Sequence, residues 1–412
     1  MKKALLISAL FGSLFIQAQR TCGTPQKIQQ LIAQDSNFET HYNAVRQQLH
    51  EAGSNLNQTM ATESVAQPAV VVTVPVVVHI LYKTSAQNIS DAQIASQMTV
   101  LNNDYRKLNA DFATVVPAVW QPLGADMEIN FVMASVDPNG NATTGITRKN
   151  ITATDYVFED DYYTTTGEPA WDPDEYLNIW VGNFSDTSLL GFAYPPAAAG
   201  YPFDGLCIDF NNFGTIGTSA TAPFNKGRTA THEIGHYFGL EHPWGDDGSA
   251  CGTVANSDGV ADTPQVGGPT YFCPDFPDYD QACSLTGNGS MFMNYMDYVN
   301  DACMAFFTNG QKLLTNAAIA GPRASVLGTP DLHAAAQIKV YPNPVSDEFS
   351  VISSNQQLTK VELFNIAGQL VLTQALNGTE AKVDMHGFEA GIYFARFYNG
   401  TKLLKSEKLI KK

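Results

Sequence analysis

Short apolar segments alternate with polar, periodic ones along most of the chain. Segment 70–82 is β-branched almost throughout, which is typical of a buried strand, and segments 127–136 and 175–184 also read as strands. Between them, residues 90–108 repeat their apolar positions with helical spacing, and Ser90 is a candidate N-cap. This alternation predicts an α/β fold with a mixed, twisted sheet.

The pattern changes near residues 322–336, where prolines and glycines interrupt it. Beyond that point, short alternating strands are separated by Asn-Gly, Gly and Pro turns, which predicts a small antiparallel sandwich. We therefore expect an α/β domain over 69–325 and an all-β domain over 336–412.

The N-terminal residues are organised differently. Residues 1–18 combine a basic start, an apolar run over 4–16 and Ala18 at the cleavage point, so they predict a secretory signal peptide. The apolar run is too short for a membrane span. Residues 19–68 are rich in Gln, Asn, Thr and Ala, with a helical pattern near 28–49, and we expect them to form a propeptide.

Composition narrows the class of partners. With 412 residues, of which 44% are hydrophobic and 15% charged, the chain is long and apolar enough for a large core. Its net charge of −17 argues against nucleic acid and against an anionic membrane surface. No later segment has the apolar length of a membrane span.

The segment HEIGHYFGLEH, residues 232–242, carries the candidate chemistry. His232 and His236 share one helix face, Gly239 can end the helix in the left-handed region, and His242 can then return to the same ion. Three imidazoles leave a fourth position open, as in catalytic zinc sites. Incidental histidines on a buried helix are the alternative, but three of the eight histidines lie here. The extended motif is the metzincin signature.

A second segment, MNYMDY at 293–298, supports this interpretation. Metzincins have a tight turn with a methionine beneath the metal, and Met296 matches it. Tyr298 follows at the distance of the tyrosine that several metzincin families keep near zinc. Ordinary core packing is the alternative for both side chains.

Together, HEIGHYFGLEHPWG, DGVADTPQV and MNYMDYVNDAC resemble the pappalysin family of metzincins, in particular its ulilysin-like secreted bacterial members. The resemblance spans residues 70–325. The C-terminal segment resembles the sorting domains of type IX secretion substrates, with its YPNP opening, AGQ turn and GIYF strand. It implies export through the periplasm and outer membrane by the secretion machinery, to a secreted or surface-attached state. A carbohydrate-binding or adhesive sandwich is the alternative.

The resemblance implies a zinc endopeptidase with protein or peptide substrates. Zinc would polarise the scissile carbonyl, Glu233 would act as general base, and Tyr298 would hydrogen-bond the oxyanion. Asp301 matches the aspartate at the base of the pocket for the residue after the cleaved bond, which implies cleavage before Arg and less well before Lys. A solvated carboxylate is the alternative for Asp301. An edge strand for extended substrates is expected at Gly191, Phe192 and Ala193.

Latency is also implied. Cys22 matches a cysteine switch, whose thiolate takes the open position on zinc. No Lys or Arg lies between Arg46 and Lys83, so self-cleavage before a basic residue cannot occur at the expected boundary. Either another protease matures the enzyme or the junction is cut at a non-basic site.

Six cysteines and export make disulfides possible. The four after the zinc motif allow three pairings, and the resemblance implies Cys251–Cys283 with Cys273–Cys303. A thiolate zinc site is the alternative, although the spacings are wide for one. Cys207 remains unpaired in this scheme, and we expect it to be buried in a strand. The resemblance also implies structural calcium, for which Asp258, Asp262 and Thr263 are candidates; a self-capping turn is the alternative.

A different class of function stays open at this point: a non-catalytic exported surface or adhesion protein with a vestigial metal site. An intact Glu233, an intact third ligand and a candidate switch cysteine argue against it.

Overall fold

The computed structural model describes residues 21–62, 71–151, 157–246, 251, 258–326, 338–353, 357–366, 369–400 and 402–412. The expected signal peptide, 1–18, lies outside these residues. No helix in the described part of the chain is long and apolar enough to cross a membrane.

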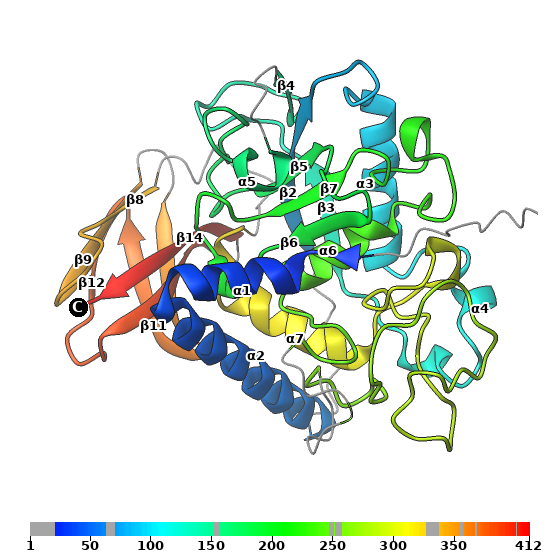
Figure 1. Ribbon diagram of the computed structural model, residues 1–412. Helices are drawn as coiled ribbons and strands as arrows, with labels where there is room; N and C mark the ends of the chain where they lie inside the picture. The colour runs from blue at the N-terminus through cyan, green and yellow to red at the C-terminus, as the bar shows by residue number, and fades with distance from the viewer. Residues whose placement is uncertain are drawn as a thin grey trace, which may run out of the picture.

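A mixed sheet organises the larger part of the molecule, as predicted (Figure 1). Its order is β1-β6-β7-β5-β2-β3, with β4 also paired to β2, and its pairs are parallel except for antiparallel β6 and β7. The strands are β1 (Thr21–Cys22), β2 (Val72–Tyr82), β3 (Ile129–Met133), β4 (Ile146–Asn150), β5 (Leu177–Gly182), β6 (Leu189–Ala193) and β7 (Leu206–Asp209).

Helices cover the sheet and connect its strands. The longer ones are α1 (Thr24–Gln34), α2 (Ser36–Thr62), α3 (Asp91–Tyr105), α6 (Arg228–Tyr237) and α7 (Asn309–Ala320). The short ones are α4 (Phe112–Val115), α5 (Phe158–Asp161), η1 (Gln121–Leu123), η2 (Pro196–Ala198), η3 (Gly217–Ser219), η4 (Asp301–Cys303) and η5 (Ala324–Val326). Ser90 caps α3 by accepting from Gln93 N at 3.1 Å, as its sequence position predicts.

The two faces of the sheet bury different sets of side chains. Along β2, Val78 and Ile80 join the core that includes α3 and α6, whereas Leu81 joins a second core with Trp180 and Phe192. Because α6 packs against β6 and β7, the zinc-motif helix lies under the strand that carries the expected substrate edge.

One buried ion pair fixes the end of α6. Arg323 is 1% exposed, and its guanidinium pairs with buried Asp204, donates to Tyr237 O at 2.9 Å and lies over the Tyr237 ring. A charge this deeply buried is tolerated only because each of these partners compensates its lost hydration.

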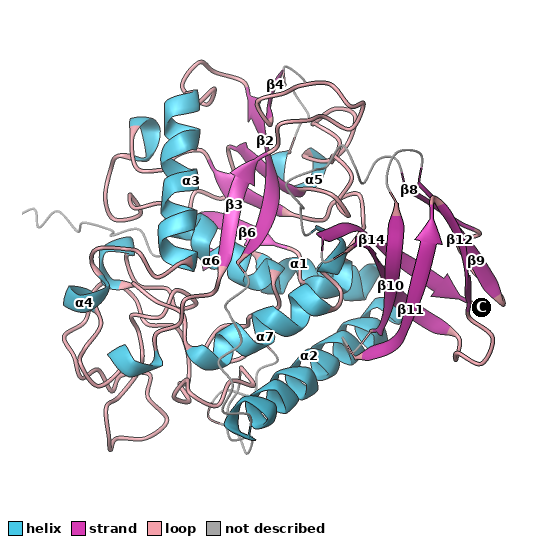
Figure 2. Cartoon of the chain, turned by 180° about the vertical axis from the view of Figure 1, so that it is seen from behind, coloured by secondary structure: helices cyan, strands magenta, loops and turns pink. Residues whose placement is uncertain are grey.

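The N-terminal segment is integrated into this core. Strand β1 adds to β6, and α2 lies alongside α7 (Figures 1 and 2). Phe38, Val45 and Leu49 of α2 are each 5% exposed or less within the main core cluster. Release of this segment would therefore expose a sizeable apolar surface.

The C-terminal residues form the predicted antiparallel sandwich. One sheet has the order β11-β10-β13-β14 and the other β12-β9-β8. Their buried side chains share one core, which includes Phe349, Val361 and Phe397. The strands are β8 (Ile338–Tyr341), β9 (Glu348–Ser353), β10 (Leu358–Asn365), β11 (Leu370–Gly378), β12 (Glu380–Asp384), β13 (Gly391–Asn399) and β14 (Lys402–Lys411).

Both predicted disulfides are present. Cys251 is bonded to Cys283 and Cys273 to Cys303, with Cα–Cα distances of 5.4 and 5.6 Å. They cross-link the irregular region between α6 and α7. Cys207 is buried on β7 and unbonded, as expected.

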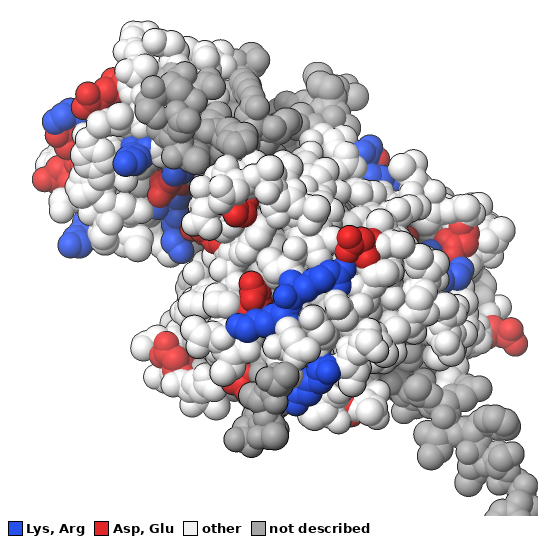
Figure 3. All heavy atoms as spheres, turned by 90° about the horizontal axis from the view of Figure 1, so that it is seen from above, with Lys and Arg blue, Asp and Glu red and all other residues white. Residues whose placement is uncertain are grey.

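The acidic side chains that the structure describes do not gather in one patch on the face of the molecule drawn in Figure 3. On the face drawn in Figure 3, acidic side chains among the described residues are scattered and stand beside basic ones. That face therefore offers no concentrated field of one sign.

Candidate active site

The position of α6 depends on contacts at its first turn. Gly227 precedes the helix with φ +72°, where a side chain would be strained and would also meet Gln97. Asp301 Oδ2 accepts from Lys226 N at 2.8 Å and from Arg228 N at 3.3 Å. These bonds supply the N-terminal cap that Gly227 cannot, and every residue of α6 is buried.

Three imidazoles converge at the C-terminal half of this helix. Nε2 of His242 lies 3.1 Å from Nε2 of His236 and 3.2 Å from Nε2 of His232. The chain returns through Gly239, whose φ of +89° is the left-handed turn predicted for it.

The hydrogen bonds of the three Nδ1 atoms determine the protonation state of the three Nε2 atoms. His232 Nδ1 donates to Tyr295 O at 2.8 Å and His236 Nδ1 to Leu240 O at 2.7 Å, because a carbonyl can only accept. His242 Nδ1 bonds the Asp246 carboxylate. In neutral rings, each Nε2 then presents a lone pair to the same point. Burial lowers the pKa of His236 to about 3, so this ring is neutral.

Converging lone pairs repel one another unless a cation lies among them. The donor set and the outer-nitrogen bonds are those of a zinc site, so the residues fit that metal. Within the described part of the chain, one group of three or more His, Cys, Asp or Glu side chains is close enough to hold a single ion, and it consists of the three histidines and Cys22. Its ligand atoms all lie within 4.8 Å of one another.

Cys22 enters this cluster from β1. Its side chain is 3% exposed, and its Sγ lies 3.3 Å from Glu233 Oε2. Burial and the Glu233 charge raise the pKa of the Cys22 thiol, whereas a cation among the imidazoles would favour the thiolate.

The Glu233 carboxylate lies next to Cys22 and is covered by Thr24. Its Oε2 lies 3.2 Å from Thr24 Oγ1 as well as near Cys22. A Cβ on Gly191 would stand 3.0 Å from Glu233 Cγ, so this close approach of strand and carboxylate requires glycine.

The segment predicted to form the methionine turn lies against α6 and His242. Met296 is fully buried, and a Cβ on Gly235 of α6 would lie 2.4 Å from its Sδ, so the methionine supports the helix directly. The Tyr298 ring packs against His242, and its hydroxyl accepts from Cys22 N at 3.3 Å.

Known proteins resemble this chain in sequence and fold. The family model described as pregnancy-associated plasma protein-A matches residues 160–320. Mature mirolysin from Tannerella forsythia, in complex with a cleaved peptide, is 45% identical with a TM-score of 0.59, over 63% of this chain and 97% of its own. A promirolysin mutant from the same organism is 40% identical with a TM-score of 0.63, over 75% of this chain and 97% of its own.

The chain belongs to the pappalysin family. It is a metalloendopeptidase, which sets aside the non-catalytic alternative. An extracellular metalloprotease of Colletotrichum graminicola is 29% identical over 75% of this chain and 94% of its own length. Residues 339–412 match a secretion system C-terminal sorting domain, so the sandwich is an export domain and the pappalysin is secreted.

Asp301 of the pappalysin is fully buried, so the alternative of a solvated carboxylate is wrong. It joins the start of α6 to the turn that follows Tyr298.

The expected edge strand is β6, and β1 occupies its outer edge. Gly23 N donates to Gly191 O at 2.8 Å, and Thr24 Oγ1 accepts from Ala193 N at 2.9 Å while lying 3.1 Å from Ala193 O. The N-terminal segment thus uses the backbone groups that an added strand would bond.

The calcium candidates do not come together as one group. Thr263 Oγ1 lies within 2.9 Å of both Asp258 oxygens, but Asp262 accepts from Thr308 Oγ1 and Gly310 N at the start of α7. Burial raises the pKa of Asp258 to about 8. Asp262 is therefore a helix cap in this structure.

Sequence reasoning missed three side chains of the site. Asp246 bonds His242, and its spacing four residues after the third ligand was the available signal. Trp244 stacks on His242 with ring centroids 4.6 Å apart and planes 4° apart. Thr24 had no local signal, because its contacts with Glu233 and Ala193 cross the whole domain.

Asp246→Asn should weaken zinc binding roughly tenfold to a hundredfold, because the amide cannot replace a carboxylate in orienting His242 and raising its basicity. The measurement is competition against a chromophoric chelator. Asp126→Asn, a carboxylate remote from the site, is the control. Equal zinc affinity of both variants would refute an orienting role for Asp246.

Proposed function

We propose that this pappalysin is made as a latent zinc endopeptidase that Cys22 keeps closed and that cleaves before arginine, then lysine. The observation that carries the proposal is Cys22 Sγ within the three-histidine cluster. We assign residues 1–18 to a signal peptide, 19–68 to the prosegment, 69–325 to the catalytic domain and 336–412 to the sorting domain. Promirolysin covers 75% of this chain against 63% for mature mirolysin, which supports an inhibitory segment ahead of the catalytic domain.

His232, His236 and His242 would hold the ion. Bound zinc supplies Lewis-acid polarisation of the scissile carbonyl and acidifies water. Glu233, on the neighbouring position of α6, takes the proton of the attacking water and returns it to the leaving amine. Tyr298 donates its hydroxyl to the oxyanion. Its burial raises the pKa of that hydroxyl, so it remains a donor.

Latency rests on three contacts made by neighbouring residues. Cys22 fills the fourth position of the cluster, Thr24 covers the general base, and β1 occupies the edge of β6. Each alone would hinder substrate, and together they block metal, base and binding edge at once.

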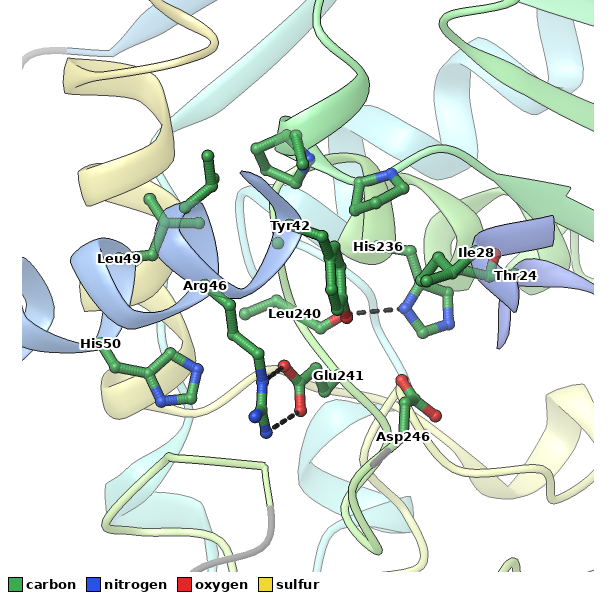
Figure 4. Close-up of a pocket in the computed structure, with 15 residues that line it drawn as sticks. Thr24, Ile28, Tyr42, Arg46, Leu49, His50, His236, Leu240, Glu241 and Asp246 are labelled. Carbon is green, nitrogen blue, oxygen red and sulfur yellow. Dashed lines mark hydrogen bonds and ion pairs between the residues drawn. The ribbon is translucent and has the colours of Figure 1, made fainter. Parts of the chain in front are cut away.

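A second anchor lies on α2. Arg46 makes two charge-assisted bonds with Glu241, the residue before the third ligand (Figure 4). Because Glu241 is 7% exposed, the pair ties the prosegment to the turn that carries His242. We propose that another protease, or cleavage at a non-basic bond, releases the segment, since no Lys or Arg follows Arg46 before Lys83.

Calcium remains a prediction at Asp258 and Thr263. A buried carboxyl with a pKa raised to about 8 would be stabilised in its charged form by a cation. Asp262 would join such a site only after giving up its bonds to α7.

Glu233→Ala should lower peptide hydrolysis by roughly a hundredfold to ten-thousandfold while leaving bound zinc unchanged, because only the proton-transfer group is removed. Turnover of a quenched peptide and metal content are measured on the same processed preparation. A chelator should abolish wild-type activity and added zinc should restore it. Turnover near the wild-type level in the variant would refute the assigned base.

Cys22→Ala should raise the activity of the full-length, unprocessed chain about tenfold or more, because the fraction of molecules with an open site increases. Cys207→Ala is the matched control, since Cys207 is also a buried free cysteine but lies on β7 outside the cluster. If both variants remain equally latent, Cys22 is not the switch.

Asp301→Asn should reduce the preference for arginine after the bond roughly tenfold to a hundredfold. Asparagine keeps an oxygen acceptor for Lys226 N and Arg228 N, so it tests charge with less damage to α6 than alanine would. Peptide-library profiling measures the effect. A basic preference equal to that of the wild type would exclude Asp301 as its source.

A further inference from the structure

Lys27 of the prosegment is a buried cation. Its residue is 8% exposed, and its Nζ donates to Glu159 O at 2.8 Å. The same Nζ lies 3.6 Å from Asp160 Oδ1 and 4.9 Å from the centre of the Phe192 ring. A backbone carbonyl, a carboxylate and an aromatic face, all from the catalytic domain, therefore surround this ammonium group.

This receptor adjoins the proposed substrate edge. Phe192 stands on β6 between Gly191, where an added Cβ would meet Glu233 Cγ, and Ala193, which bonds Thr24. The receptor for Lys27 thus begins one residue along the edge from the strand position that touches the proposed general base.

The receptor suits a positive charge independently of Lys27. It is built on α5, whose sequence is FEDD. Glu159 Oε1 accepts from Ser185 N and Oγ, whereas its Oε2 is buried without a hydrogen-bond partner among the described residues. A buried, unpartnered carboxylate oxygen is costly, and a further donor would relieve that cost. The Phe192 ring adds a cation–π contribution.

We propose that this receptor, lined by Glu159, Asp160 and Phe192, becomes a second substrate subsite when the prosegment leaves, and that it takes a basic side chain. The inference rests on the proposed endopeptidase function and extends its specificity. The subsite serves a substrate residue other than the one that follows the cleaved bond, which Asp301 would recognise.

Strand geometry makes the subsite reachable. In an antiparallel pair, residues directly opposite one another project to the same face of the sheet. A substrate residue opposite Phe192 would project toward α5, and the long stem of Lys or Arg can pack on the ring while its charged head reaches Glu159 O. Arginine, with five donors, would satisfy Glu159 O and Oε2 together, so it should be preferred to lysine.

The test is peptide-library profiling of the secreted, processed enzyme. The wild type should prefer basic residues at a second substrate position, in addition to the position that follows the cleaved bond. The double variant Glu159→Gln and Asp160→Asn should reduce that preference roughly threefold to fivefold, since the carboxylates are partly exposed, and leave the preference after the bond unchanged. Asp160→Lys should convert it to a preference for acidic residues.

Asp126→Asn with Glu128→Gln is the matched control. This control also removes two negative charges, but from the residues just before β3, at the opposite edge of the sheet from β6. It should change neither of the two basic preferences. If the enzyme hydrolyses peptides but prefers a basic residue only at the position after the cleaved bond, the proposed subsite is refuted and the proposed endopeptidase function stands. An equal loss in the control pair would assign the effect to net charge. Absence of any hydrolysis would instead refute the proposed function.

Discussion

Three imidazole lone pairs directed at one buried point are the constraint on which this structure depends. The arrangement is unfavourable without a cation, yet the outer nitrogens hold the rings in place through Tyr295 O, Leu240 O and Asp246. These acceptors come from three different segments: the methionine turn, the end of α6 and the loop beyond the third ligand. The folding of those segments is thus coupled to the orientation of the metal ligands.

The N-terminal segment, which we propose to be a prosegment, is stabilised by the same groups that would perform the proposed catalysis. Thr24 and Cys22 contact Glu233, and Thr24 also bonds the backbone of Ala193. Apolar side chains of α2 then join the main core. Glu233 is 1% exposed, and its contacts with Thr24 and Cys22 help to compensate the burial of its carboxylate. Opening therefore requires removal of the segment's core contacts as well as its contacts in the cleft.

The zinc ligands were predictable because their geometry is local: helical spacing brings His232 and His236 together, and a left-handed Gly239 returns His242. Alternating strands likewise predicted both domains. The disulfides and Cys22 required the family resemblance, since nothing in their spacing selects a partner.

Asp262 shows the limit of local reasoning. It stands close to Asp258 in sequence, but tertiary structure directs it to the start of α7. The contacts of Thr24 and Lys27 link residues more than a hundred positions apart, so no sequence window contains them.

Asp301, the residue proposed to determine specificity, also contacts the helix that carries two of the candidate metal ligands. Asp301 bonds the first turn of α6, while Arg228 of that turn donates its side chain to Asp301 O and to Asp111. The candidate metal ligands His232 and His236 stand about one and two turns further along the same helix. A substrate cation that drew the Asp301 carboxylate toward itself would weaken the cap of α6, because one carboxylate oxygen accepts both backbone bonds. The Arg228 network opposes that movement by holding the backbone of Asp301 in place. Under the proposed specificity, a basic substrate side chain would therefore use the charge of Asp301 without displacing α6.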